Sequence, residues 1–223
     1  MIEYHSEHYS AFKKALSVDE SWPGNNIKHW WNYVTNNASS NLPERRLTRH
    51  ELKELCQNKK YSAEECIGAV MAWGGQNRKH GKMLFGRKDE IIPIIQNMRN
   101  GQLDYISAYK DFDGIWKQGE PLGMGAAYFT KLIFFCEPSR EGFIMDQWTS
   151  KSTNLILGSN VIHLTKNTVN KKNNHETYDM YCKFVQKMAK DLNKTAEYIE
   201  ICMFSKGGRN KSAWRQYVVD NWK

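Results

Sequence analysis

Helix-start signals recur along this chain and do most to restrict its fold. Thr48 is followed three residues later by Glu51, and Ser62 is followed three residues later by Glu65. In each pair the hydroxyl and the carboxylate can cap each other's backbone amides, which is typical of the first turn of a helix. We therefore predict helices over 48–57 and 62–73, each opened by a capping box.

Apolar residues at helical spacing extend this pattern over most of the chain. Further helices are expected at 27–34, 89–99, 103–116, 126–135, 178–192, 196–204 and 214–222. Residues 36–43 and 167–174 have loop composition, and only 142–145 and 160–164 are candidates for short strands. The sequence predicts a mainly α fold, long enough at 223 residues for one core or for two small lobes.

Positive charge is concentrated in two zones. Residues 151–223 carry 13 Lys and Arg against 6 Asp and Glu, whereas residues 1–150 carry 19 against 18. Within that near-neutral first part, 77–88 holds five basic residues, among them Arg78, Lys82 and Arg87, and no acidic one. Local basic zones suit a polyanionic partner better than evenly spread charge does, so we expect these residues to contact phosphates.

The sequence gives little support for a metal site, another cofactor or a membrane segment. The five cysteines are widely spaced without a Cys-x-x-Cys pair, and the histidines form no cluster with them, so no metal and no other cofactor is expected. The polar N-terminus lacks a signal core, and no apolar run reaches the roughly 20 residues that cross a bilayer. We therefore expect a soluble, cytoplasmic protein without a membrane partner, and a monomer.

The most informative stretch is 121–151, PLGMGAAYFTKLIFFCEPSREGFIMDQWTSK. Gly123, Met124 and Gly125 lead directly into the predicted helix 126–135. Paired glycines allow a tight turn and a close approach, and amides at the start of a helix can hold a phosphate, although an isolated pair is more often an ordinary turn. A loop then leads to an apolar run that ends in one carboxylate, Asp146.

This combination resembles the helix–hairpin–helix and Gly/Pro-rich-loop motif of the DNA glycosylase superfamily, and in particular its 8-oxoguanine glycosylase branch. Gly123, Gly125, Asp146 and the basic Lys151 match that motif, and the resemblance covers about 45–155 in helix order. It implies a single unit over 1–223 with two helical lobes and a DNA-binding cleft between them. One lobe would be formed by about 45–150 and the other by the N- and C-terminal segments together.

The resemblance also implies a mechanism. Asp146 would stabilise the oxocarbenium-like sugar while the bond to an extruded base breaks. Bifunctional relatives carry a lysine at the position of Ala127, so its absence favours a monofunctional enzyme that uses water. Lys131, one helical turn further on, is the alternative amine.

A second segment, 72–78, ends a buried helix in two glycines and opens the basic zone. By resemblance, Gln76 or Asn77 would fill the space left by the extruded base, and an ordinary helix end with a solvated loop is an equal alternative. Trp73 and Trp148 are candidates to stack on that base, although a Trp in a helical protein is more often in the core.

The sequence thus predicts a DNA glycosylase acting on double-stranded DNA that contains a modified base. Short length, the absence of the hairpin lysine and flanks rich in Asn, Lys and Trp favour a hypermodified cytosine of phage DNA, as in small bacterial defence glycosylases. The alternatives are 8-oxoguanine excision in repair, and a non-catalytic hairpin module that binds distorted DNA.

Overall fold

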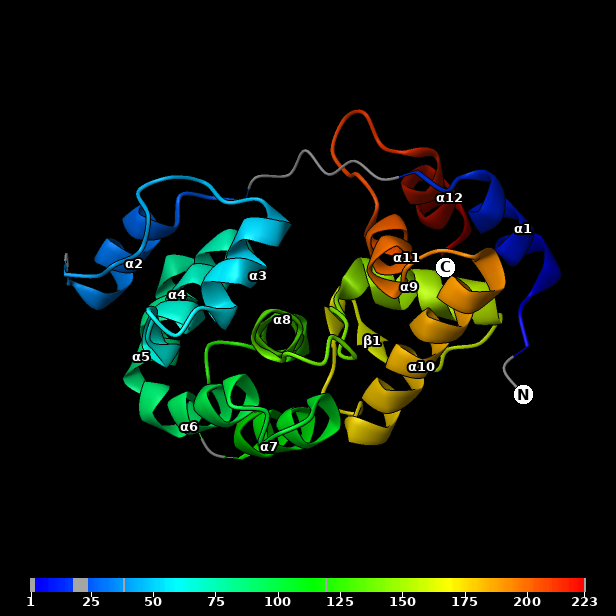
Figure 1. Ribbon diagram of the computed structural model, residues 1–223. Coiled ribbons are helices and arrows are strands. Elements are labelled where there is room, and N and C mark those ends of the chain that lie inside the picture. The colour runs from blue at the N-terminus through cyan, green and yellow to red at the C-terminus, as the bar shows by residue number, and fades with distance from the viewer. Residues whose placement is uncertain (1–2, 18–23, 38, 119, 223) are drawn as a thin grey trace. The chain divides into compact units, whose positions relative to one another are not determined.

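The computed structural model describes residues 3–17, 24–37, 39–118 and 120–222 (Figure 1). Within these ranges the chain forms twelve helices and one two-stranded sheet, which confirms the mainly α fold. Its contacts divide it into two compact units. The middle unit is Glu20–Gly142, and the terminal unit combines Met1–Asp19 with Phe143–Lys223.

The middle unit is built around one apolar helix, α8. Helices α3, α4, α6 and α7 all pack against α8, and Figure 1 shows it end-on among them. Phe129, Leu132, Ile133 and Phe135 of α8 are fully buried. The helices of this unit are α2 (Ile27–Thr35), α3 (Arg49–Gln57), α4 (Ala63–Trp73), α5 (Arg78–Gly86), α6 (Lys88–Arg99), α7 (Tyr105–Lys117) and α8 (Ala126–Cys136).

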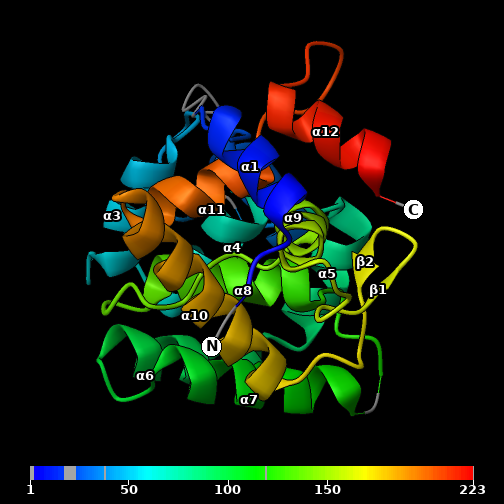
Figure 2. The same ribbon diagram turned by 90° about the vertical axis from the view of Figure 1, so that its right-hand side faces the viewer.

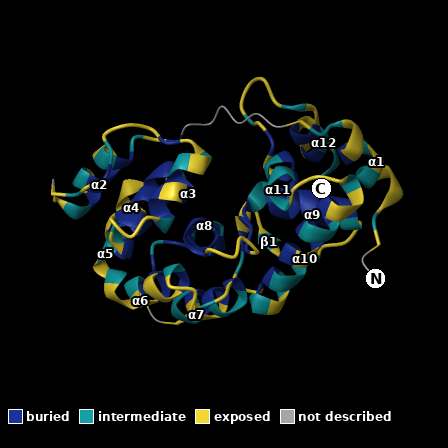
Figure 3. Cartoon of the chain, in the orientation of Figure 1, coloured by how far each residue is buried: buried dark blue, intermediate teal, exposed yellow. Residues whose placement is uncertain are grey.

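The terminal unit surrounds helix α9, with α1, α11 and α12 packed against it. Figure 2 shows α1 beside α12, so the two ends of the chain meet in this unit. Figure 3 shows α8 and α9 as mainly buried ribbons, each at the centre of its own unit. The elements are α1 (Ser6–Lys14), α9 (Gln147–Leu157), β1 (Leu164–Thr165), β2 (Thr168–Val169), α10 (His175–Leu192), α11 (Ala196–Phe204) and α12 (Ala213–Asn221).

Both predicted capping boxes are confirmed. The Thr48 hydroxyl accepts from the Glu51 amide while the Glu51 carboxylate accepts from the Thr48 amide, and Ser62 and Glu65 do the same at α4. Each box satisfies amides that the first helical turn leaves without a partner. Each of the nine helices expected from the sequence is also present, with ends shifted by at most three residues.

The strand predictions were wrong. Residues 142–145 form no strand, and the carbonyls of Phe143 and Ile144 accept from side chains rather than from a neighbouring strand. Of 160–164 only Leu164 is in a strand, paired with Val169 across a tight turn in a segment predicted to be a loop. Helices α1, α5 and α9 were not predicted, because their polar and basic faces hide the apolar periodicity.

Three cysteines that are far apart in sequence meet in the middle unit. Cys56, Cys66 and Cys136 come from α3, α4 and α8, are fully buried, and the Cys66 thiol donates to the Cys56 carbonyl at 3.8 Å. Within the described ranges no group of three or more His, Cys, Asp or Glu side chains is arranged to hold a metal ion. Nor does any helix in those ranges combine the length and apolar character needed to cross a bilayer.

Candidate functional site

Asp146 stands at the junction between a buried extended segment and helix α9. The residues before it, Phe143, Ile144 and Met145, are at most 3 % exposed. Two tyrosine hydroxyls of α10 fix this segment, since Tyr178 donates to the Phe143 carbonyl at 2.9 Å and Tyr181 to the Ile144 carbonyl at 2.7 Å. The apolar run seen in the sequence is therefore held in place by these hydrogen bonds, and it sets the position of Asp146.

The Asp146 carboxylate is the N-cap of α9. Its Oδ1 accepts from the backbone amides of Trp148 at 2.8 Å and Thr149 at 3.2 Å, and the Thr149 hydroxyl accepts from the Asp146 amide at 2.9 Å. The residue is 8 % exposed. Both carboxylate bonds within the described residues go to Oδ1, so Oδ2 is the oxygen that can face a ligand. One carboxylate oxygen is thus held rigidly while the other keeps its lone pairs available.

Two buried cations accompany Asp146 in the terminal unit. The Arg215 guanidinium lies 3.7 Å from the centre of the Trp148 ring and donates to the carbonyls of Phe204 and Ser205. Burial lowers the pKa of Arg215 to about 10, an effect that the negative charge of Asp146 opposes. Arg215 is 5 % exposed and nothing in the sequence singled it out, because only the fold brings it to α9.

Lys151 is the second of these cations. Its Nζ donates to Asn167 Oδ1 at 2.9 Å and lies 4.8 Å from the centre of the Trp148 ring. Burial, and then the nearby Arg215 charge, lower the pKa of Lys151. The structure thus brings the predicted residues Asp146, Trp148 and Lys151 together, with Trp148 serving as a platform for cations.

In the middle unit, the predicted hairpin residues Gly123, Met124 and Gly125 lie between α7 and α8. Gly123 has φ +76°, and a Cβ there would lie 2.3 Å from the His80 carbonyl oxygen of α5. Gly125 is the N-cap of α8 and provides no side-chain cap. Its carbonyl accepts from the Tyr128 amide at 2.9 Å, so the Ala126 and Ala127 amides are the ones that can meet an external acceptor. Met124 between them is 6 % exposed and packs inward. The two glycines therefore have separate roles, one in close packing and one at the open helix end.

The two wedge candidates make contacts inside the middle unit. Gln76 is 3 % exposed, and its Nε2 donates to the Gly123 carbonyl at 2.9 Å, so it connects the α4–α5 turn to the hairpin. Asn77 accepts from the Lys79 amide at 2.8 Å and caps α5. In this structure Gln76 bonds to the hairpin. Asn77 caps a helix, as it would in the alternative of an ordinary helix end.

Trp73 lies in the core of the middle unit. It is 7 % exposed, its Nε1 donates to the Leu47 carbonyl at 3.0 Å, and its ring meets Phe135 edge-on. Lys131 extends back along α8, with its Nζ donating to the Ala127 carbonyl at 2.8 Å. Its amine therefore lies beside Ala127, the position at which bifunctional members of the glycosylase superfamily that the sequence resembles carry a lysine.

The predicted phosphate contacts on α5 differ in how they are engaged. Arg78 and Lys82 lie 4.5 and 4.7 Å from the ring of Tyr33, a side chain that is half exposed. Arg87 instead forms a two-pronged pair with Glu90, at 2.6 and 2.8 Å, and also donates to the Glu120 carbonyl. Arg78 and Lys82 present charge to solvent, whereas the charge of Arg87 is largely used within the unit.

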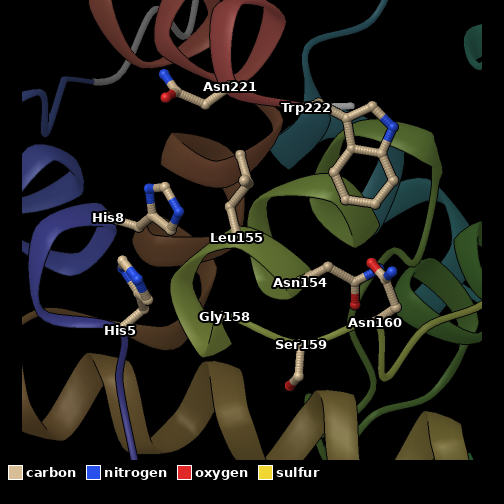
Figure 4. Close-up of a pocket in the computed structure, with 9 residues that line it drawn as sticks. All are labelled: His5, His8, Asn154, Leu155, Gly158, Ser159, Asn160, Asn221 and Trp222. Carbon is tan, nitrogen blue, oxygen red and sulfur yellow. The ribbon is translucent and has the colours of Figure 1, made fainter.

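A pocket of about 290 Å³ opens on the terminal unit. Figure 4 shows the stacked rings of His5 and His8 on one side, Trp222 on the other and Asn154 between them. His8 shares a hydrogen bond of 2.9 Å with the Tyr217 hydroxyl, and burial lowers the pKa of His8, so its ring is neutral near pH 7. None of the described lining residues is Asp, Glu, Lys or Arg, so the pocket suits a neutral polar group.

Comparison with known proteins identifies one family. The family model described as "Putative 8-oxoguanine DNA glycosylase OGG-like protein" matches residues 17–204 of the chain. No curated protein and no solved structure matches the chain.

Proposed function

Because the chain belongs to the 8-oxoguanine DNA glycosylase OGG-like family, we propose that it removes a modified base from double-stranded DNA by hydrolysing the N-glycosidic bond. The observation that carries this proposal is Asp146. A carboxylate with one oxygen fixed by two amides and the other available, beside a dry apolar segment, suits the stabilisation of positive charge on a sugar.

The reaction needs the target nucleotide to leave the duplex, because the glycosidic bond is not accessible within the stack. As the C1′–N bond breaks, its electron pair leaves with the base, which takes up a proton. The Asp146 carboxylate stabilises the resulting oxocarbenium-like sugar and orients water. The water oxygen bonds to C1′ and loses its proton, so the products are free base and an abasic site.

The proposed enzyme is monofunctional. Ala127 supplies no amine at the hairpin, and the Lys131 amine donates a hydrogen bond to the Ala127 carbonyl. Water is then the nucleophile that remains. The open end of α8 and the exposed cations of α5 are assigned to DNA phosphates in this proposal.

The family description names 8-oxoguanine, and that base is the first substrate to test. A second candidate, the glucosylated or otherwise hypermodified cytosine of phage DNA, is supported by the pocket of Figure 4. Its Asn, Ser and Trp side chains can bond to and stack on an uncharged polar adduct. Asn154 lies eight residues after Asp146 on α9, roughly 12 Å along the axis, so the pocket and the carboxylate share one rigid helix. With this substrate the protein would act in defence against phage.

The test is abasic-site formation on matched duplexes that carry 8-oxoguanine, hydroxymethylcytosine or glucosylated hydroxymethylcytosine. Excision of any one of them, lost in Asp146→Asn, supports the glycosylase proposal and identifies the base. Tight binding to these duplexes without release of any base would instead indicate a non-catalytic hairpin module.

A further inference from the structure

The loop between α11 and α12 is a strongly basic segment of the terminal unit. Residues 205–212 read Ser-Lys-Gly-Gly-Arg-Asn-Lys-Ser, with three cations and no acidic residue. The Ser212 amide donates to the Lys206 carbonyl at 3.1 Å and closes the base of the loop, and Arg209 and Lys211 are exposed. Figures 1 and 2 show that the loop extends beyond the two helices that flank it.

A buried arginine supports this loop from within the unit. The Arg215 guanidinium lies against Gly207, where a Cβ would be 2.7 Å from its Nη1. Its Nε is buried and has no hydrogen-bond partner among the described residues, and the same holds for the hydroxyl of Ser205. Buried donors are normally satisfied, so two orphaned donors at one end of a basic loop point to an acceptor-rich ligand.

From these observations we propose that 205–212 and Arg215 form a binding site for a phosphodiester of the DNA backbone. Arg209 and Lys211 supply exposed charge at the tip of the loop, and the orphaned donors of Ser205 and Arg215 lie at its base. Phosphate oxygens are the acceptors that such a combination of cations and donors recognises. Glycine at 207 lets the loop backbone pass close to the guanidinium.

The location gives this site a consequence for the chemistry. Arg215 stacks on Trp148, whose amide donates to the Asp146 carboxylate. A phosphate held by the loop would therefore be connected to the proposed catalytic carboxylate through two residues. This inference rests on the proposed function for the identity of the polyanion as DNA.

Binding of the full chain to an undamaged duplex, measured across a salt series, tests the site. The double variant Arg209→Gln with Lys211→Gln should weaken binding about tenfold at low salt and lower the slope of log K against log salt by about 2, since each lost phosphate contact removes about 0.9. Gly207→Ala changes no charge and should also weaken binding, because its Cβ displaces the loop from Arg215.

The matched control is Lys13→Gln with Lys14→Gln on α1, which removes the same charge from exposed positions of the same unit that lie outside the basic zone 151–223. Equal losses in the loop and control variants, or full affinity in Gly207→Ala with an unchanged fold, would overturn the site. Excision is measured separately. If binding depends on the loop but no base is released, the glycosylase proposal is refuted and the phosphate site stands. If a base is excised but binding does not depend on the loop, the phosphate site is refuted and the glycosylase proposal stands.

Discussion

Asp146 combines a structural and a proposed chemical role in one side chain. Its Oδ1 caps α9, and that bond also fixes the direction in which Oδ2 points. The sequence could predict the importance of this residue, because an apolar run that ends in a carboxylate is local information. It could not predict Arg215 as a neighbour, since that contact depends on packing between helices.

Replacement of Asp146 can separate the two roles. Asn is as good an N-cap as Asp, so Asp146→Asn should unfold at the temperature of the parent while its excision rate falls by on the order of 10² or more. Asp146→Ala should lose the same activity and also about 1 kcal/mol of stability. Single-turnover kinetics and thermal melts measure both. Parent-like excision by Asp146→Asn would exclude the carboxylate as a catalytic group.

Lys131 allows a test of the monofunctional assignment. Borohydride reduces an imine between a lysine and the abasic sugar to a stable cross-link, so a water-using enzyme should yield almost no trapped complex. Because the Lys131 amine lies beside Ala127, Lys131→Ala is the matched variant. An efficient cross-link that disappears in this variant would make Lys131 the nucleophile and the enzyme bifunctional.

At the scale of elements, helices that have a capping box or apolar residues at helical spacing could be predicted from the sequence, whereas α5 and α9 could not. Helix α9 carries QWTSKSTNLIL, in which buried Ser, Thr and Asn side chains bond to backbone groups and replace the usual apolar face. Helix α5 is basic and contains Gly81, where a Cβ would collide with Trp30 of α2. Both helices depend on tertiary contacts, and both carry or position predicted site residues.

The hairpin depends on one such contact, between Gly123 and α5. Gly123→Ala should destabilise the protein by about 2–4 kcal/mol, from the unfavourable positive φ and from overlap with the His80 carbonyl, and should weaken DNA binding. Gly101→Ala is the control, because Gly101 also has positive φ but a Cβ there would meet no atom within 4 Å, and it should cost only about 1–2 kcal/mol. Chemical denaturation compares them. Equal losses would show that the contact with α5 contributes nothing.

At the scale of the whole molecule, the sequence gives the distribution of charge along the chain, and the structure shows which charged side chains are exposed. The excess of positive charge over 151–223 is visible in the sequence, but only the structure separates exposed cations from those that are buried or paired. Lys151 is buried beside Asp146 and Arg87 is held by Glu90, whereas Arg78 and Lys82 remain on the surface. The net charge of +8 therefore overstates the charge available to DNA.

This distinction predicts unequal effects for two residues that look alike in the sequence. DNA binding should weaken steeply with salt, and Lys82→Gln should lower the slope of log K against log salt by about 1 and reduce affinity for all sequences equally. Arg87→Gln should leave the slope nearly unchanged, because the guanidinium already pairs with Glu90, and should instead cost up to about 1 kcal/mol of stability. Fluorescence anisotropy at several salt concentrations, with thermal melts in parallel, measures both quantities. If Arg87→Gln flattened the slope as much as Lys82→Gln, the Glu90 pair would have to open on DNA, and net charge alone would describe binding.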